Sequence, residues 1–167
     1  TLTFVNELVA DQLSIEAIHR IYTGTTIAQL RTELSGCFDL EPAPQPTPAM
    51  LARMVELGRL VLLSPDGTAE WLVPKAGAFD GVRDLDGAYL EHALAGSTAE
   101  VGYQHGLEEM LALVGSGEVA AGILIRPTSL LEIQRTAREG LLMPPKSTFF
   151  TPKLRTGLVI RPTAPLP

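Results

Sequence analysis

The sequence predicts a mixed α/β (α+β) fold, with a central sheet of about five strands and helices packed on one or both of its faces. Segments with apolar residues at helical spacing alternate with short apolar runs that are typical of buried strands. Two of these runs flank the turn-forming residues 64–67. Hydrophobic residues make up 46% of the 167 positions, which supplies enough apolar surface for a packed core.

The N-terminal part predicts a strand followed by a helix. Residues 2–8 are suited to a first strand, and the segment after Asp11 carries apolar residues at helical spacing: Ala17, Ile18 and Ile21. His19 and Arg20 then fall near the end of this helix, where a cation interacts favourably with the helix dipole.

The next segment predicts a helix, a connector and another helix. We expect the first helix over residues 26–34, ending before Gly36. Prolines alternate with small residues over 41–48, which predicts a stiff, extended connector. Thr47 followed by Pro48 is typical of a helix start, with the threonine hydroxyl accepting a backbone N–H bond. This helix should end at Gly58 and turn three side chains inward: Leu51, Met54 and Val55.

Residues 59–73 predict a β-hairpin, because Ser64-Pro65-Asp66-Gly67 has turn-forming residues in a suitable order. The pattern over residues 75–102 is weaker. It contains one helical stripe, which Gly96 can close: Leu85, Ala88, Tyr89 and His92.

The C-terminal third predicts helix, strand, helix and a last strand. A helical stripe over residues 107–114 leads through a glycine turn into a buried strand at 120–125. Ser129 and Glu132 have the capping-box spacing, so we expect a helix from there to about Glu139. Prolines exclude helix after Met143. A strand at 157–161, a single domain over 1–162 and a frayed tail at 163–167 complete the expectation.

Composition excludes several classes of protein. The net charge of −6 disfavours binding to nucleic acid. Cys37 is the only cysteine, which excludes an internal disulfide and is consistent with a cytoplasmic location. The longest apolar runs are too short for a membrane helix. The chain opens without an initiator Met or a signal peptide, so we expect a fragment of a longer protein.

A long segment near the C-terminus reads Met143-Pro144-Pro145-Lys146-Ser147-Thr148-Phe149-Phe150-Thr151-Pro152-Lys153-Leu154-Arg155-Thr156-Gly157-Leu158-Val159. Shorter elements accompany it: Phe4-Val5-Asn6-Glu7-Leu8, Ile18-His19-Arg20, Tyr103-Gln104-His105-Gly106 and Ile125-Arg126-Pro127. Together they closely resemble the bacterial domain-of-unknown-function family 1015, and the resemblance spans essentially the whole chain.

The resemblance implies that this chain is the C-terminal domain of an uncharacterised bacterial protein. Family members are much longer, and their Asp-Gly-His-His-Arg run belongs to a preceding region without a counterpart here. That run is similar to one in ParB-like proteins, a group that includes nucleotide-dependent free-serine kinases. The resemblance thus implies a nucleotide or phosphate role for the full protein, with this part alone not catalytic and needing no cofactor of its own.

The strongest candidate site is a rigid, locally basic loop on an acidic protein. Its residues are suited to contacting an anionic ligand or a neighbouring domain: Lys146, Ser147, Thr148, Lys153 and Arg155. The loop is no Walker loop, because Pro144 and Pro145 lack the N–H groups that surround a phosphate there. Alternatively, the prolines fix a chain crossing, Phe149 and Phe150 fill the core, and the segment docks on the missing N-terminal region or a second subunit.

Three further residues are weaker candidates for ligand binding: Arg20, His19 and His105. A partly buried, hydrogen-bonded structural histidine is the more common role for His19, and His105 has Tyr103 nearby. The histidines show no metal-ligand spacing, so no metal is expected. Cys37 is expected in the core, and the acidic side chains on a solvated helix surface: Asp80, Asp84, Asp86, Glu91, Glu108 and Glu109.

These observations favour a domain that contributes an anion-contacting loop to a site completed by the N-terminal region. A structural or interaction module is the alternative, and part of a nucleotide-dependent small-molecule kinase is a third interpretation. Clustering of the candidate cations and histidines around one pocket would favour ligand binding. A flat, exposed apolar patch would favour docking.

Overall fold

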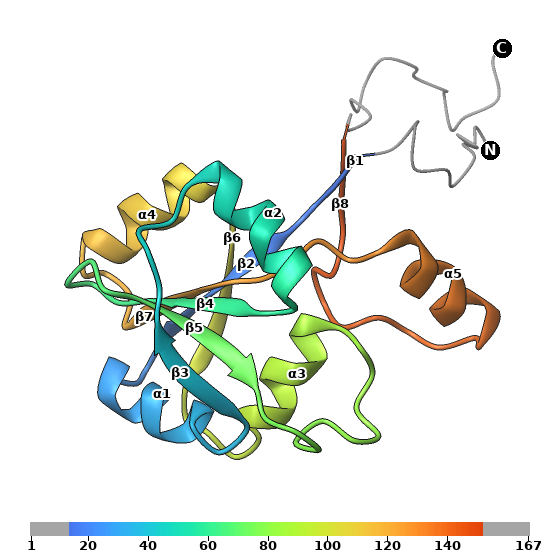
Figure 1. Cartoon of the computed structure of the whole chain (residues 1–167), viewed down its shortest axis with the longest axis horizontal. Helices are drawn as coiled ribbons and strands as arrows, with labels where there is room; N and C mark the ends of the chain where they lie inside the picture. Colours follow the sequence, from blue (N-terminus) through green and yellow to red (C-terminus); the bar gives the residue numbers. More distant parts are fainter. Residues whose placement is uncertain (1–13, 152–167) are drawn as a thin grey trace, which may run out of the picture.

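The computed structural model describes residues 14–151, which form a mixed α/β fold with a six-stranded antiparallel sheet and a separate two-stranded ladder (Figure 1). The strands are β1 (Ser14–Glu16), β2 (Ile18–Thr23), β3 (Phe38–Pro42), β4 (Leu60–Leu63), β5 (Ala69–Pro74), β6 (Glu100–His105), β7 (Ala121–Leu124) and β8 (Phe149–Thr151). The helices are α1 (Ile27–Leu34), α2 (Pro48–Leu57), α3 (Asp86–Ala93), α4 (Leu107–Gly115) and α5 (Leu130–Arg138).

The large sheet has the order β3-β5-β4-β7-β2-β6, and each neighbouring pair is antiparallel. Strands β4 and β7 lie in the middle, and every residue of both is buried. Their apolar runs do not alternate with polar residues because helices cover both faces of the sheet. The expected hairpin is present as β4 and β5, and the expected buried strand as β7.

Two separate hydrophobic clusters fill the two faces. On one face, Leu30 and Leu34 of α1 and Leu90 of α3 pack with Leu60, Leu62 and Ile123 of the sheet. On the other face, α2 and α4 supply Met50, Met54, Met110 and Val114, which pack with Val61, Leu63 and Leu124. The helices therefore lie in two layers with the sheet between them, and α5 lies apart from both (Figure 1).

The prediction of a helix around Ala17, Ile18 and Ile21 is wrong, because residues 14–16 and 18–23 form β1 and β2. Strand β2 pairs with β6 on one side and with β7 on the other. Residues on both of its faces are buried, so its apolar positions lose the alternation that marks a half-exposed strand. His19 and Arg20 consequently lie in a central strand and have no helix dipole to neutralise.

The sequence does not predict strands β3 and β6 either, and together with β2 they bring the large sheet to six strands. Both form its edges and carry polar side chains, among them the exposed Asp39, Glu41 and Glu100. Polar residues are common on edge strands because they oppose pairing with other chains. The predicted strands at 2–8 and 157–161 and the tail lie outside the described residues.

The helix boundaries agree well with the sequence signals. Thr26 caps α1, and Gly58 follows α2 with a φ of 65°, in the left-handed region that favours glycine. Two details of α2 differ: Thr47 makes no side-chain capping bond, and Val55 is 53% exposed and not part of the core. Its buried face is instead formed by Met50 and Met54, one helical turn apart. Helix α3 ends at Ala93, before the expected Gly96.

Helix α5 is attached through polar contacts. Ser129 accepts the backbone N–H of Glu132, as its spacing predicts, whereas the Glu132 carboxylate accepts from Arg83 at 3.1 Å. Arg83 also donates to Thr136 and, at 2.6 Å, to Glu139.

Within residues 14–151, no helix has the length and apolarity that crossing a membrane would require.

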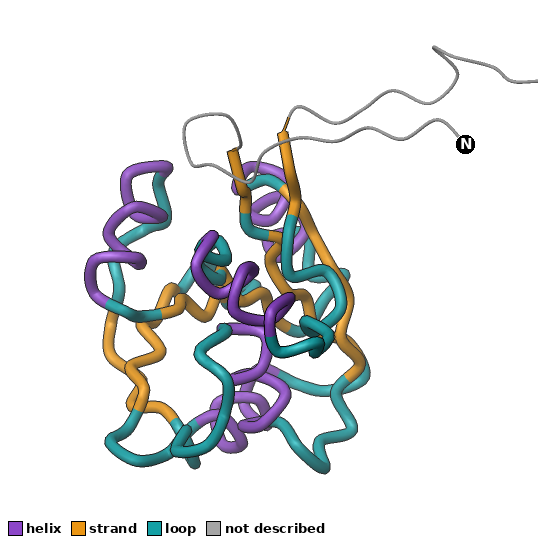
Figure 2. Tube along the Cα trace, turned by 90° about the vertical axis from the view of Figure 1, so that its right-hand side faces the viewer, coloured by secondary structure: helices purple, strands orange, loops and turns teal. Residues whose placement is uncertain are grey.

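Strands β1 and β8 join residues from the two ends of the described chain. Ser14 pairs with Thr151, Ile15 with Phe150 and Glu16 with Phe149. Figure 1 and Figure 2 both show β1 and β8 at the top of the molecule.

Candidate functional site

A cavity that contains both His19 and His105, and is therefore called the main cavity, lies on the α2 and α4 side of the sheet and has a volume of about 350 Å³. Helix α2, the start of α4, strand β1 and the ends of β2 and β7 surround it. Most of its walls are apolar, and the residues around it are Ile15, Glu16, Ala17, His19, Leu51, Ala52, Val55, His105, Gly106, Leu107, Ile125 and Pro127. Its polar side chains are thus few: two histidines and one glutamate.

His19 is the most buried polar group of this cavity, with 2% of its surface exposed. Its Nδ1 atom accepts the backbone N–H of Ile125 at 3.2 Å. Burial lowers the pKa of His19 to about 4, and the charges of His105 and Arg20 act in the same direction. The ring is therefore neutral near pH 7, and because Nδ1 is an acceptor its proton is on Nε2. His19 offers this N–H as a donor beside an apolar cavity.

His105 lies at the mouth of the cavity, at the end of β6. Its Nε2 atom is 2.7 Å from Oε2 of Glu16, and its ring stacks on Phe149 with a centroid distance of 4.0 Å. The side chains of both Glu16 and His105 remain partly exposed. A carboxylate beside an imidazole orients the ring, so this pair fixes the His105 side chain at the mouth.

Arg20 lies on the opposite face of the sheet from His19, because successive side chains of β2 point to opposite faces. Its guanidinium group is 4.8 Å above the centre of the Tyr103 ring and donates to the carbonyl oxygens of Ile18 and, at 3.3 Å, of Pro145. Arg20 borders a second cavity, next to α3. His19 and His105 therefore border one cavity, and Arg20 borders another.

The candidate basic loop is described up to Thr151. Lys146 is exposed and has a φ of 56°, in the left-handed region. The Ser147 hydroxyl donates to the Pro144 carbonyl at 2.7 Å, and the Ser147 carbonyl accepts from the Thr128 hydroxyl at 2.7 Å. Neither of the two cavities is bordered by Lys146, Ser147 or Thr148. Lys153 and Arg155 lie outside the described residues.

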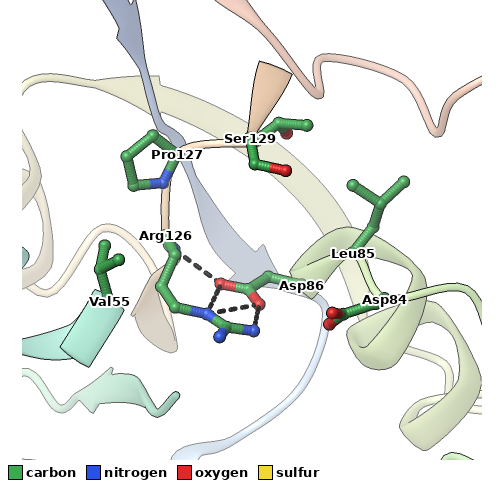
Figure 3. A pocket seen from close by; sticks show the side chains of 8 residues that line it. Val55, Asp84, Leu85, Asp86, Arg126, Pro127 and Ser129 are labelled. Carbon is green, nitrogen blue, oxygen red and sulfur yellow. Dashed lines mark hydrogen bonds and ion pairs between the residues drawn. The ribbon is translucent and has the colours of Figure 1, made fainter. Parts of the chain in front are cut away.

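A third hollow contains an ion pair that sequence reasoning missed (Figure 3). Asp86, in the first turn of α3, accepts the backbone N–H of Arg126 at 2.6 Å and two donors of its guanidinium group. Asp86 is buried, so its assignment to a solvated helix surface is wrong. The pair joins α3 to the end of β7, which is a structural task. No local signal could reveal it, because the partners lie far apart in sequence.

Between Ser14 and Thr151, no group of three or more His, Cys, Asp or Glu side chains is arranged to hold a metal ion. Cys37 is partly buried and packs against the core cluster of α1 and α3, where a small apolar side chain is expected.

Comparisons with known proteins give structural neighbours only. No family model matches the chain, and a search of curated proteins finds no relative. The fold is similar to that of a free serine kinase mutant in complex with AMP, with a TM-score of 0.59, 12% identity, and coverage of 89% of this chain and 58% of that one. A conserved hypothetical protein from Pyrococcus furiosus has a similar fold, with a TM-score of 0.59 and 11% identity. The match covers 89% of this chain and 60% of that one.

A third neighbour is the free serine kinase in complex with AMP, with a TM-score of 0.57 and 10% identity over 89% of this chain and 58% of that one. The chain thus spans about three fifths of the length of these neighbours. At such low identity the likeness concerns the fold: residues 14–151 adopt an α/β fold that is also found in nucleotide-bound kinase structures.

Proposed function

We propose that this chain is the ligand-binding C-terminal domain of a longer bacterial, cytoplasmic protein of the family 1015 type, and that its main cavity receives a nucleotide. The observation that carries the proposal is the neutral, buried His19, whose ring borders a largely apolar cavity of about 350 Å³. Apolar walls with a few well-placed polar groups are typical of small-molecule sites, and this volume falls within their usual range.

The chemistry of the cavity suits the uncharged part of such a ligand. Leu51, Val55 and Leu107 offer apolar surface to a flat ring, and the Nε2–H of His19 suits an uncharged acceptor such as a ring nitrogen. The His105–Glu16 pair lies at the mouth, where the polar end of the ligand would leave. The fold shared with AMP- and ADP-bound kinases supports a nucleotide over other flat ligands.

The anionic end of the ligand is assigned to the basic loop and to the region outside this chain. Lys146 is exposed, as a residue that meets a ligand or another domain must be. In this proposal Lys146, Ser147 and Thr148, with Lys153 and Arg155, complete a phosphate-contacting surface together with the N-terminal region. Any catalysis, such as phosphorylation of a small molecule as in the ParB-like serine kinases, requires that region.

Ligand binding is tested by thermal shift with AMP, ADP, ATP, phosphate, phosphoserine and serine. A nucleotide at 100 times its Kd should stabilise the chain by about 2.7 kcal/mol through mass action. Ala52→Phe fills the cavity from an exposed position on α2 and should abolish the shift. Ala49→Phe, on the same helix but away from the cavity, should retain it. An unchanged melting temperature with every nucleotide would overturn the proposal.

The loop is tested separately with Lys146→Ala. If Lys146 contacts a phosphate, the variant should lose the advantage that ADP has over adenosine and keep its affinity for adenosine. Equal losses for both ligands would contradict a phosphate contact, because adenosine carries no phosphate.

A docking module is the second candidate function, and helix α5 favours it. The buried side chains of α5 are polar, Glu132 and Thr136, whereas Leu131 is 78% exposed and Leu142, just beyond the helix, is 94% exposed. Large apolar side chains that are strongly exposed can mark protein contacts. If these two residues dock on the missing region, Leu131→Ser with Leu142→Ser should weaken the association of this chain with a separately produced N-terminal part. Unchanged association would contradict it.

A further inference from the structure

The second cavity lies on the α1 and α3 side of the sheet, on the other side of β2 from the main cavity, and has a volume of about 220 Å³. It lies between α3 and the edge strand β6. This volume is below the usual range for drug-sized ligands, so the cavity suits a smaller molecule than a nucleotide. An inference about it goes beyond the proposed function and concerns different residues.

Arg20 supplies a buried positive charge to this cavity. The residue is 4% exposed, and none of the carboxylates between Ser14 and Thr151 lies within ion-pair distance of its guanidinium group. A buried cation is ordinarily paired with an anion because burial removes its hydration. Here two carbonyl oxygens and the face of Tyr103 are its neighbours. Burial consequently lowers the pKa of Arg20, against the opposing influence of Tyr103, Tyr22 and nearby carboxylates.

Neighbouring residues hold the guanidinium group in place without neutralising it. A Cβ atom on Gly87 would lie 3.0 Å from Nη2 of Arg20, so the absent side chain lets the cation rest on the first turn of α3. The Pro145 carbonyl is 3.3 Å from the same atom. Of the five N–H donors of a guanidinium group, these contacts use only part, which leaves donors for a ligand carboxylate.

Glu91 gives the same cavity a negative charge at its exposed rim. A carboxylate there repels a phosphate or another simple anion and attracts an ammonium group. The cavity therefore has a buried positive charge, Arg20, and an exposed negative charge, Glu91. Its other walls are largely apolar and include Leu90, Leu94 and Val101. Tyr22 also borders it, and burial raises the pKa of Tyr22, which keeps its hydroxyl neutral.

From this arrangement we propose that the second cavity binds a small zwitterion, an α-amino acid with a short side chain, with its carboxylate on Arg20 and its ammonium group toward Glu91. The apolar walls leave room for a side chain of only a few atoms. Tyr103 stacks on the Arg20 guanidinium and closes one side of the carboxylate subsite.

The test compares three probes by isothermal titration calorimetry on the 167-residue chain: alanine, propionate, which lacks the amine, and ethylamine, which lacks the carboxylate. We expect alanine to bind at least tenfold more tightly than either analogue. Glu91→Gln, at an exposed position, should remove the advantage of alanine over propionate. Glu108→Gln, an exposed carboxylate on α4, should leave it intact. Failure of alanine to bind, or to outbind propionate, would overturn the inference, as would an unchanged advantage in Glu91→Gln.

Two further variants separate the result from folding and from the proposed nucleotide site. Arg20→Lys keeps a positive charge but lacks the two-pronged donor set, so alanine should bind at least tenfold more weakly to it; unchanged affinity would refute the role of Arg20. Ala52→Phe fills the main cavity and should leave alanine binding unchanged. Loss of alanine binding in Ala52→Phe would place the ligand in the main cavity and overturn the assignment to the second one.

Discussion

The Nδ1 atom of His19 lies 3.2 Å from the backbone nitrogen of Ile125 and accepts its hydrogen bond, which ties β2 to the end of β7 through a neutral ring. Protonation of this nitrogen breaks the bond and places a charge in the interior. The imidazole therefore couples the stability of the sheet to pH.

This coupling predicts a loss of stability in mild acid. The pKa of His19 is lowered from 6.5 to about 4 by burial, so the unfolded chain binds the proton more readily than the native one. The stabilisation is fully present above pH 6.5, falls as the pH drops toward 4, and amounts to about 3 kcal/mol in all. Urea unfolding at pH 7.5, 5.5 and 4.5 measures it. His19→Gln keeps a hydrogen-bond acceptor that does not titrate, so its free energy of unfolding should fall less steeply with decreasing pH. Parallel pH dependences for the variant and the unaltered chain would contradict the role assigned to His19.

Removal of Asp86 should destabilise the protein strongly. Asp86→Ala leaves the Arg126 guanidinium and backbone N–H without their acceptor, and breaking a buried pair costs about 3 kcal/mol or more. Asp39→Ala is the control, because Asp39 and Lys75 form an exposed pair at 3.7 Å that should contribute less than about 1 kcal/mol. Denaturant unfolding at pH 7.5 compares them, and equal losses would argue against a structural role for the Asp86–Arg126 pair.

A methyl group on Gly122 should force β7 and α4 apart. A Cβ atom there would lie 2.5 Å from Cε of Met110 and 2.7 Å from Cγ2 of Val114. Overpacking of this kind costs about 1–3 kcal/mol, so Gly122→Ala should lower the melting temperature. Gly115→Ala is the matched control at the end of α4, where a Cβ atom meets nothing within 4 Å, and it should be neutral or slightly stabilising. A neutral Gly122→Ala would show that α4 adjusts freely.

The two hydroxyls that precede α5 and α2 should differ in their contribution to stability. Ser129 accepts the N–H of Glu132 at 3.2 Å, so Ser129→Ala should cost about 1 kcal/mol. Thr47 makes no such bond, and Thr47→Ala should therefore have little effect. Chemical denaturation of both variants measures the difference, and a larger loss for Thr47→Ala would contradict the capping geometry.

Local signals in the sequence predicted most helices and the central hairpin. Thr26, Gly58 and Gly140 mark helix ends through backbone conformation, which depends on near neighbours in the chain. Strand β2 could not be predicted in this way. Its identity depends on pairing with β6 and β7, about 80 to 100 residues away, and burial on both faces removed the alternation that marks a strand.

The sequence identified several candidate site residues by their chemistry but could not show which of them lie close together. His19, Arg20 and His105 stand out in the sequence, yet only the folded structure decides which of them share a cavity. Asp86 was misassigned because its partner Arg126 lies 40 positions away. Long-range partners of this kind can be located only once the sheet order is known. The roles of Lys146, Ser147, Thr148, Lys153 and Arg155 in ligand binding stay predictions.

The ladder of β1 and β8 also determines how the protein resists a mechanical load. Ser14 faces Thr151 at the outer end of two antiparallel strands, so a pull on these two residues separates the ladder one residue pair at a time. Such an opening breaks few hydrogen bonds at once, whereas sliding two strands past each other breaks many together. The first force-induced event should therefore be the unzipping of this ladder and the release of the Glu16–His105 pair, while the six-stranded sheet stays intact.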